Sequence, residues 1–247
     1  MARRVHSLST SGALAATIVG AGSVAAGWNA GALLITYFVS ATLISRWRSA
    51  AKDAATGRVV SKGGERDAMQ VFANGGLFAV GCAAAAMATS PVNRALLLAF
   101  AVGSLAASSS DSWATEIGVA LGGTPLGVRE LKRVPTGTSG AVTAFGLGGA
   151  LAGAAIVALA TLVLGFGRNL ATMAFIGGLS GCIADTIIGA FVQERRWCDA
   201  CSEPTERVLH SCGAATRVTG GVARVDNDLV NLMATLAGGA VAAAILA

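Results

Sequence analysis

The sequence predicts an all-α fold, a polytopic integral membrane bundle of about seven transmembrane helices with a site on its cytoplasmic side. Hydrophobic residues make up 54% of the 247 residues and charged residues only 13%, a composition that excludes an ordinary soluble domain. Glycine occurs 33 times and aromatic residues account for 5%, so helices can approach one another closely through small side chains. The expected location is a prokaryotic plasma membrane or an organelle envelope, with multiple membrane passes.

Seven apolar stretches are candidate spans, because a hydrocarbon core of about 30 Å requires roughly 20 apolar residues per helix. They are residues 9–27, 29–45, 68–88, 92–110, 140–164, 170–192 and 229–247. The first two are short, and the second follows the first almost at once, which favours a retained hairpin over a cleaved signal peptide. The expected organisation is one transmembrane domain over residues 1–247 with a small cytoplasmic Cys/His insertion at 194–225.

Basic residues indicate the orientation of these spans. Seven spans place 16 of the 18 Lys and Arg residues on one side and leave Arg94 and Arg168 on the other. Because Lys and Arg concentrate in cytoplasmic loops, the N-terminus is expected inside and the C-terminus outside. The basic face could attract anionic lipid headgroups or a phosphorylated ligand.

Polar side chains recur at the start of the third span. Lys62, Arg66, Gln70 and Asn74 are spaced by four residues, which predicts one cationic and amide stripe along a helix. The alternative is an ordinary juxtamembrane helix whose cations reach the headgroups. That alternative accounts poorly for the two amides, since an unpaired amide in hydrocarbon is costly.

Carboxylates occur at the ends of two spans that run in the same direction. Asp111 and Glu116 follow the fourth stretch, and Asp185 lies in the sixth. An ionisable group at bilayer depth costs several kcal/mol unless it is paired or hydrated, so these residues are functional candidates and suit Mg²⁺. The alternative is a structural ion pair with Lys132 or Arg66. The similarity of Asp185-Thr186 to Asp111-Ser112 hints at an internal duplication.

The segment KRVPTGTSGAV, residues 132–142, has the composition of a phosphate-binding loop. Lys132 and Arg133 precede two glycines that flank hydroxyl side chains, and a helix is expected to follow. The residues with this expected role are Gly137, Thr138, Ser139 and Gly140. The segment lacks the Walker A pattern, and a capped helix start is the alternative.

Two further clusters lie near the C-terminus. Asp226, Asn227, Asp228 and Asn231 open the last span, where the acids could join a metal site or cap the helix. Cys198, Cys201, His210 and Cys212 form a C-x₂-C-x₈-H-x-C pattern that suits tetrahedral zinc. Cytoplasmic thiols stay reduced, so zinc or no ligand is expected there rather than a disulfide. Cys82 and Cys182 lie within spans and are expected to pack.

Seven segments in order resemble an integral membrane family of long-unknown function that includes the plant phytyl-phosphate kinase of vitamin E synthesis. They are SGALAA, QVFANGG, DSWATEIG, KRVPTGTSGAV, DTIIGAFVQ, the Cys/His segment and DNDLVN. The resemblance extends from about Ser9 to the C-terminus. Ser112 replaces the threonine usual in the family but keeps a hydroxyl, and many relatives begin with a further apolar segment.

The resemblance implies an enzyme that transfers a phosphoryl group from a nucleoside triphosphate, CTP, to an isoprenoid monophosphate such as phytyl phosphate. The implied partners are this lipid phosphate, the nucleotide and membrane lipids, without nucleic acid, and the oligomeric state stays open. The family pattern covers Lys62, Arg66, Gln70, Asn74, Asp111, Glu116, Lys132, Arg133, Gly137 to Gly140, Asp185, Gln193, Asp226, Asn227, Asp228 and Asn231.

On physical grounds we assign these residues to two roles. The expected Mg²⁺ ligands are Asp111, Glu116, Asp185, Asp226 and Asp228, and the remaining residues bind substrate or nucleotide. Lys132 and Arg133, with Asp111, Glu116 and Asp185, are expected to act in catalysis. Two alternatives remain: a transporter with Asp111 and Asp185 as an ion site, and a CTP-dependent cytidylyltransferase acting on a lipid phosphate.

Overall fold

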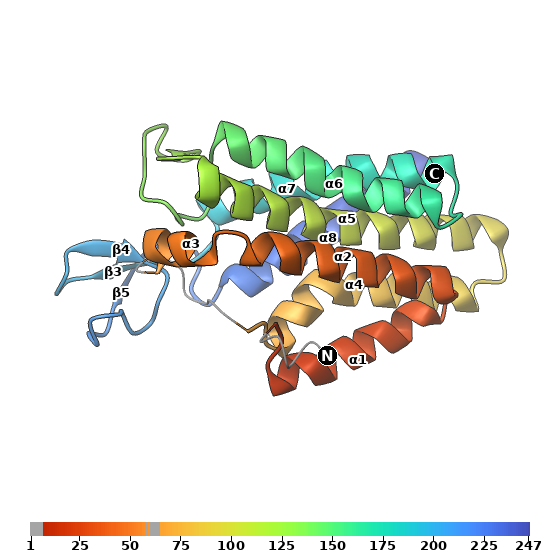
Figure 1. The fold of residues 1–247 in the computed structure, drawn as a ribbon, viewed down its shortest axis with the longest axis horizontal. Helices are drawn as coiled ribbons and strands as arrows, with labels where there is room; N and C mark the ends of the chain where they lie inside the picture. The colour runs from red at the N-terminus through yellow and green to blue at the C-terminus, as the bar shows by residue number, and fades with distance from the viewer. Residues whose placement is uncertain (1–6, 58, 60–64) are drawn as a thin grey trace.

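The computed structural model describes residues 7–57, 59 and 65–247, and Figure 1 shows them as a helical bundle with two small sheets. The helices are α1 (Thr10–Val24), α2 (Trp28–Arg46), α3 (Ser49–Thr56), α4 (Ala68–Met87), α5 (Pro91–Leu121), α6 (Ala144–Val163), α7 (Arg168–Phe191) and α8 (Asn227–Leu246). The strands are β1 (Leu126–Gly127), β2 (Ala141–Val142), β3 (Arg195–Cys198), β4 (Glu203–Thr205) and β5 (Arg217–Gly220). Both sheets are antiparallel, β1-β2 and β4-β3-β5.

The expected number of seven spans is one too high. Six helices in the described ranges are long and apolar enough to cross a membrane, whereas α1 has only 15 residues. At 1.5 Å per residue α1 is about 22 Å long, short of a core of about 30 Å. It ends in a tight turn that leads to Gly27, whose φ of 119° is accessible to glycine. The short helix packs along α4.

Long connections gather at one end of the bundle. Figure 1 shows α3, the β1-β2 sheet and the β4-β3-β5 sheet at this end, with the C-terminus at the opposite end. We call the former the loop end. The short connections α1–α2, α4–α5 and α6–α7 lie at the other end, where α5 and α7 begin and where Arg94 and Arg168 belong to the first turns. This arrangement agrees with the expected separation of the basic residues.

Helix α5 is the centre of the bundle and contacts α2, α4, α6, α7 and α8. Its residues from Ala101 to Ser110 are all buried, so this segment has no lipid-facing side. The serine hydroxyls at its end donate hydrogen bonds to backbone carbonyls of neighbouring helices over 2.6–2.9 Å. Small side chains therefore allow close packing, and the hydroxyls find partners inside the bundle.

The helix continues well past the expected boundary at residue 110 and ends at Leu121. The segment DSWATEIGVAL contains no proline, and its single internal glycine does not stop the helix. Asp111 and Glu116 are therefore both helical residues of α5, which extends eleven residues beyond the expected end of the fourth span. The fifth expected span, residues 140–164, is shorter in the structure because α6 begins at Ala144 with Thr143 as its N-cap.

Glycines set the distance between α5, α7 and α8. A Cβ atom built on Gly177 would lie 2.6 Å from the carbonyl oxygen of Gly238 and 2.9 Å from the Cα of Gly103. Real Cβ atoms do not approach backbone so closely, so each of these three positions requires glycine. The three helices therefore make backbone contact near the middle of the bundle.

Replacing Gly177 by alanine should destabilise the bundle by about 1–3 kcal/mol, because the new methyl group would overlap the backbone of two neighbouring helices. Thermal unfolding in detergent measures this effect. Gly148→Ala on α6 is the matched control, since nothing lies within 4 Å of its Cβ position. Equal melting temperatures for the two variants would contradict the glycine contact.

Candidate functional site

A cavity of about 670 Å³ lies at the loop end, within the range of roughly 300–1,000 Å³ that small-molecule sites occupy. Its walls come from the helices α2 to α8, together with the β1–β2 loop and the β4–β5 connection. Segments far apart in the sequence therefore meet at one site. Most of the residues predicted from the sequence line this cavity, and a few do not.

Acidic groups outnumber basic groups among the described lining residues. The carboxylates are Asp53, Asp111, Glu116, Asp185, Glu206, Asp226 and Asp228. The cations are Lys52, Arg66 and Arg207. An excess of negative charge repels a phosphorylated ligand unless cations accompany it. The cavity therefore favours a cation, or an anion that carries one.

Asp111 on α5 and Asp185 on α7 interact directly through their carboxyl groups. Two ionised carboxylates near each other repel, so a cation beside them would stabilise the pair. Asp185 Oδ2 is buried and has no hydrogen-bond partner in the described part of the chain. The structure thus brings together the two acids that the sequence placed in separate spans. The carboxyl oxygens of Asp111 and Asp185 are therefore available to bind a cation.

Glu116 forms an ion pair with Lys52 of α3. Neither Lys132 nor Arg66, the partners considered from the sequence, occupies this position. Lys52 Nζ also donates to the carbonyl oxygens of Ile44 and Ser45 at 3.0 and 2.7 Å, near the C-terminus of α2. Lys52 is buried, so this network fixes α3 against α5 and α2. Its sequence signal was weak, because Lys52 lies in a segment with many other basic residues.

The glycine-containing loop lines the cavity between β1 and β2. Thr138 donates its hydroxyl to the carbonyl oxygen of Pro135 at 2.7 Å, which closes a turn. Gly137 and Gly140 have φ values of 91° and 72°. A Cβ at Gly140 would lie 2.4 Å from the backbone of Ala190, so glycine allows the loop to rest against the end of α7. All four expected residues, Gly137 to Gly140, therefore belong to the cavity wall.

Lys132 and Arg133 are exposed and do not line the cavity. Arg133 Nη1 donates to the carbonyl oxygen of Thr124, and the backbone of Lys132 bonds to Gly127 within the hairpin. Of the cations expected to bind phosphate, Arg66 does line the cavity, and Lys52 and Arg207 line it as well. The segment between β1 and β2 therefore leaves Lys132 and Arg133 exposed while Gly137 to Gly140 line the cavity. The spacing of residues in the sequence does not reveal this difference.

The stripe expected from Lys62 to Asn74 is only partly helical. Helix α4 begins at Ala68, so Arg66 precedes it and lies in a bridge with Leu8, while Lys62 falls outside the described residues. Gln70 forms a reciprocal capping box with Asp67, and Asn74 donates to the carbonyl oxygen of Gln70 at 2.8 Å. Arg66, Gln70 and Asn74 all line the cavity. Capping gives the amide of Gln70 a partner at the start of α4, so this amide is not left unpaired in the membrane.

Four expected residues at the start of α8 also line the cavity: Asp226, Asn227, Asp228 and Asn231. Asp226 is the N-cap, since its Oδ1 accepts from the backbone N–H of Leu229 at 3.0 Å. The capping alternative therefore holds for Asp226, while Asp228 in the first turn is buried. Gln193 is buried outside the lining, where its side chain hydrogen-bonds to Glu206.

Glu206 and Arg207 line the cavity, and no motif in the sequence pointed to either residue. They belong to the Cys/His segment, in which only the Cys and His residues were predicted to have a role. Ser139 of the glycine-containing loop donates its hydroxyl to Glu206 Oε1. Burial raises the pKa of Glu206 to about 7, although hydrogen bonds from Ser139 and Gln193 oppose the shift. The two loops are therefore joined through a carboxyl group that titrates near neutral pH.

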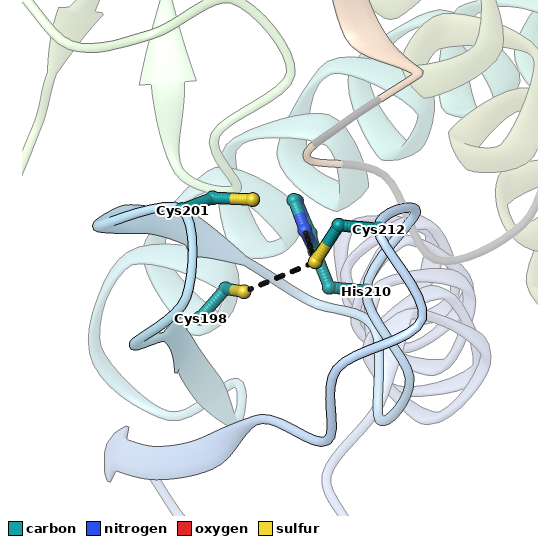
Figure 2. Close-up of side chains that lie close together, drawn as sticks. All are labelled: Cys198, Cys201, His210 and Cys212. Carbon is teal, nitrogen blue, oxygen red and sulfur yellow. Dashed lines mark hydrogen bonds between the residues drawn. The ribbon is translucent and has the colours of Figure 1, made fainter.

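The four Cys/His residues lie close together at the loop end and do not line the cavity. Figure 2 shows their side chains directed toward one another. The structure thus brings the predicted metal ligands into one cluster.

The raised pKa of Glu206 predicts a pH effect on stability. The protonated Glu206 carboxyl stabilises the folded state. This stabilisation is fully present below the ordinary carboxyl pKa of 4.5 and is lost as pH rises through about 7. Glu206→Gln should therefore show a smaller drop in melting temperature between pH 5 and pH 8 than the wild-type protein. Glu130→Gln changes an exposed carboxylate outside the cavity lining and should retain the full drop. An unchanged drop in Glu206→Gln would contradict the assignment.

Comparison with known proteins places these features in a family. Residues 1–239 match the family described as integral membrane protein DUF92. Protein PGR of Arabidopsis thaliana is 28% identical over 252 residues, covering 93% of this chain and 86% of PGR. An uncharacterized membrane protein of Synechocystis is 31% identical over 78% of this chain and 74% of its own length. An uncharacterized membrane protein of Methanocaldococcus jannaschii is 26% identical over 56% of this chain and 47% of its own length.

No solved structure matches the chain at a significant level. The family match covers nearly the whole sequence, and its description agrees with the six apolar helices of the bundle. The chain therefore belongs to the DUF92 family of integral membrane proteins.

Proposed function

We propose that the protein is a membrane-embedded phosphotransferase that uses CTP to convert an isoprenoid monophosphate, such as phytyl phosphate, to the diphosphate. The observation that carries the proposal is the acidic cavity at the loop end, where Asp111 and Asp185 meet beside the glycine-containing loop. A lipid phosphate presents its charged group at this level of a membrane protein, while its tail stays in hydrocarbon. The family resemblance of the sequence supports the same reaction.

The residues present fit a bound magnesium ion. Mg²⁺ prefers carboxylate oxygens and commonly combines one or two carboxylates with phosphate oxygens of the substrate. Asp111, Asp185 and Asp228 supply such oxygens, and the buried Oδ2 of Asp185 lacks a hydrogen-bond partner among the described residues. Glu116 already forms an ion pair with Lys52, so it would stabilise the wall of the site rather than bind the ion. When bound, Mg²⁺ supplies positive charge that offsets the charge of the phosphate oxygens.

Cationic and backbone groups would orient the phosphates. Arg66 and Arg207 line the cavity from opposite parts of the sequence, and the loop from Gly137 to Gly140 can present backbone N–H groups to an anion. This division agrees with phosphoryl transfer, in which positioning and charge neutralisation contribute most of the catalysis.

The cavity also has an apolar wall suited to a lipid. Val119 of α5 and Leu147 and Ala150 of α6 line it, and Leu147 is 59% exposed. Gly118 and Gly146 bring α5 and α6 together beside this wall. An isoprenoid chain could therefore lie along α6 while its phosphate reaches the carboxylates.

The reaction needs little proton transfer. The acceptor is a phosphate monoester with a second pKa of about 6, so it is largely ionised at pH 7. One of its oxygens forms a bond to the γ-phosphorus of CTP as the bond from that phosphorus to the β–γ bridging oxygen breaks. CDP leaves with the electron pair, and the isoprenoid diphosphate is the second product. The side chains of the cavity hold both phosphates in line for this exchange.

Labelled nucleotide distinguishes the proposal from its alternatives. Purified protein in detergent, supplied with Mg²⁺ and phytyl phosphate, should move label from γ-labelled CTP to the lipid and leave the label of α-labelled CTP in the nucleotide. Label from α-labelled CTP in the lipid would instead identify a cytidylyltransferase. The absence of any transfer, together with Asp111-dependent solute flux in vesicles, would identify a transporter.

Asp111→Asn should reduce γ-phosphoryl transfer at least about 100-fold, because a neutral amide binds Mg²⁺ weakly beside phosphates. The fold should be retained, since the amide has the same shape and removes an intramembrane charge. Asp199→Asn is the control, because Asp199 is an exposed partner of Arg217 outside the cavity lining. Transfer by Asp111→Asn near the wild-type rate would show that this carboxylate is structural.

A further inference from the structure

The ligand atoms of Cys198, Cys201, His210 and Cys212 lie within 4.8 Å of one another. Cys198 Sγ is 3.7 Å from Cys212 Sγ, which in turn is 3.2 Å from His210 Nδ1. For zinc bound at about 2.3 Å to sulfur and 2.0–2.1 Å to nitrogen, the edges of a tetrahedron are roughly 3.6–3.8 Å long. The cluster in Figure 2 therefore has dimensions that a single zinc ion would fit after small adjustments.

Two turns supply the four ligands. Cys198 ends β3, and Cys201 lies in the turn before β4, where Ser202 has a φ of 55°. In the second turn the backbone N–H of His210 donates to Ala214, and that of Gly213 donates to His210, both at 2.9 Å. Gly213 accepts a φ of 86° there. Both turns are closed by backbone hydrogen bonds, and together they direct the four ligand atoms toward one point.

The surroundings of His210 resemble those of a metal ligand. His210 Nδ1 faces the sulfur of Cys212, whereas Nε2 is buried without a hydrogen-bond partner in the described structure. Glu203 Oε2 lies 3.9 Å from that Nε2 atom. A carboxylate behind the second nitrogen is the usual arrangement for a histidine that binds zinc, because it fixes the tautomer and the ring orientation.

Residues 194–225 bury too little apolar surface to fold on that basis alone. Cys198 and Val225 are the buried hydrophobic residues of this segment, while Val208, Leu209 and Val218 are exposed. Small domains with so little core usually depend on disulfides or a metal. A disulfide does not supply the missing constraint, since the cysteines are free and the 3.7 Å sulfur separation far exceeds a bond of about 2.05 Å.

The segment between the second and third ligands forms part of the cavity wall. Glu206 and Arg207 line the cavity, and the backbone N–H of Glu206 donates to Val59 at 2.9 Å. Thr216, just after the second turn, donates its hydroxyl to the carbonyl oxygens of Arg207 and Val208. The position of the wall therefore depends on the two turns that carry the Cys and His side chains.

We propose that Cys198, Cys201, His210 and Cys212 bind one structural zinc ion that holds Glu206 and Arg207 against the cavity. The set of three thiolates and one imidazole leaves zinc no open position, which is characteristic of structural rather than catalytic sites. This proposal does not depend on the reaction proposed above. Any ligand that enters the cavity would meet a wall maintained by this centre.

Metal analysis tests the binding. Protein purified in detergent without chelators should contain about one zinc per chain, and X-ray absorption of that zinc should show three sulfur ligands and one nitrogen ligand. Cys198→Ser should lose most of the zinc. Cys82→Ser, at a buried thiol within the bundle, should keep it. Zinc-free wild-type protein that also takes up none on titration would overturn the proposal, without bearing on phosphoryl transfer.

Proteolysis of the wild-type protein tests the positioning role. A zinc-selective chelator should increase tryptic cleavage after Arg207 at least about tenfold, because apo protein would no longer hold the wall segment. Cleavage after Arg133, in the exposed β1–β2 loop, is the internal control and should not change. Restored protection on adding zinc completes the expected result. Equal cleavage after Arg207 with and without bound zinc would show that the metal does not hold the wall.

Discussion

The close approach of α5 to α7 and α8 is the constraint on which the site depends. A Cβ at Gly181 of α7 would lie only 2.3 Å from the Cβ of Ala107 on α5. Asp185 and Asp111 each follow these residues by four positions, one helical turn nearer the loop end. The contact of small residues therefore brings the two carboxyl groups together in the next turn. Larger side chains below them would separate the acids and enlarge the cavity.

Charge at the loop end follows from this packing. Two carboxyl groups in contact favour a shared proton or a bound cation, and the remaining lining acids add to the negative potential. Lys52 compensates Glu116 directly, which leaves Asp111 and Asp185 as the pair without a described cationic partner. An ordinary structural ion pair therefore accounts for one of the three intramembrane acids predicted from the sequence. The other two are those for which a bound cation has a physical reason.

Loops outside the bundle complete the cavity. The hydrogen bond from Ser139 to Glu206 connects the glycine-containing loop to the β4–β5 connection. The first segment lies between α5 and α6 in the chain, and the second lies between α7 and α8. One is stabilised by its position against the end of α7, and the other by the turns around the Cys/His cluster. The bundle thus positions the acids, whereas the peripheral segments position the groups that face them.

The sequence by itself determined the membrane bundle, the separation of basic residues and a number of the polar residues of the cavity wall. These properties follow from local composition and periodicity, so Asp111, Asp185, the loop from Gly137 to Gly140 and the start of α8 could all be recognised as candidates. Helix length was less predictable, because α1 is apolar enough for a span but is ended early by the turn at Gly27. The length of α5 was also underestimated, because hydropathy ends the apolar stretch at residue 110 whereas the helix continues through polar residues to Leu121.

Only the tertiary structure decided which charged groups meet. Lys52 and Glu116 are 64 residues apart, and Ser139 and Glu206 are 67 apart, so no local pattern links them. Lys132 and Arg133 adjoin the glycines in sequence, yet the hairpin leaves them exposed while Arg66 and Arg207 enter the lining. The physical reason is that spacing fixes the face of a helix, whereas the direction of a loop side chain depends on backbone turns and on contacts from distant segments.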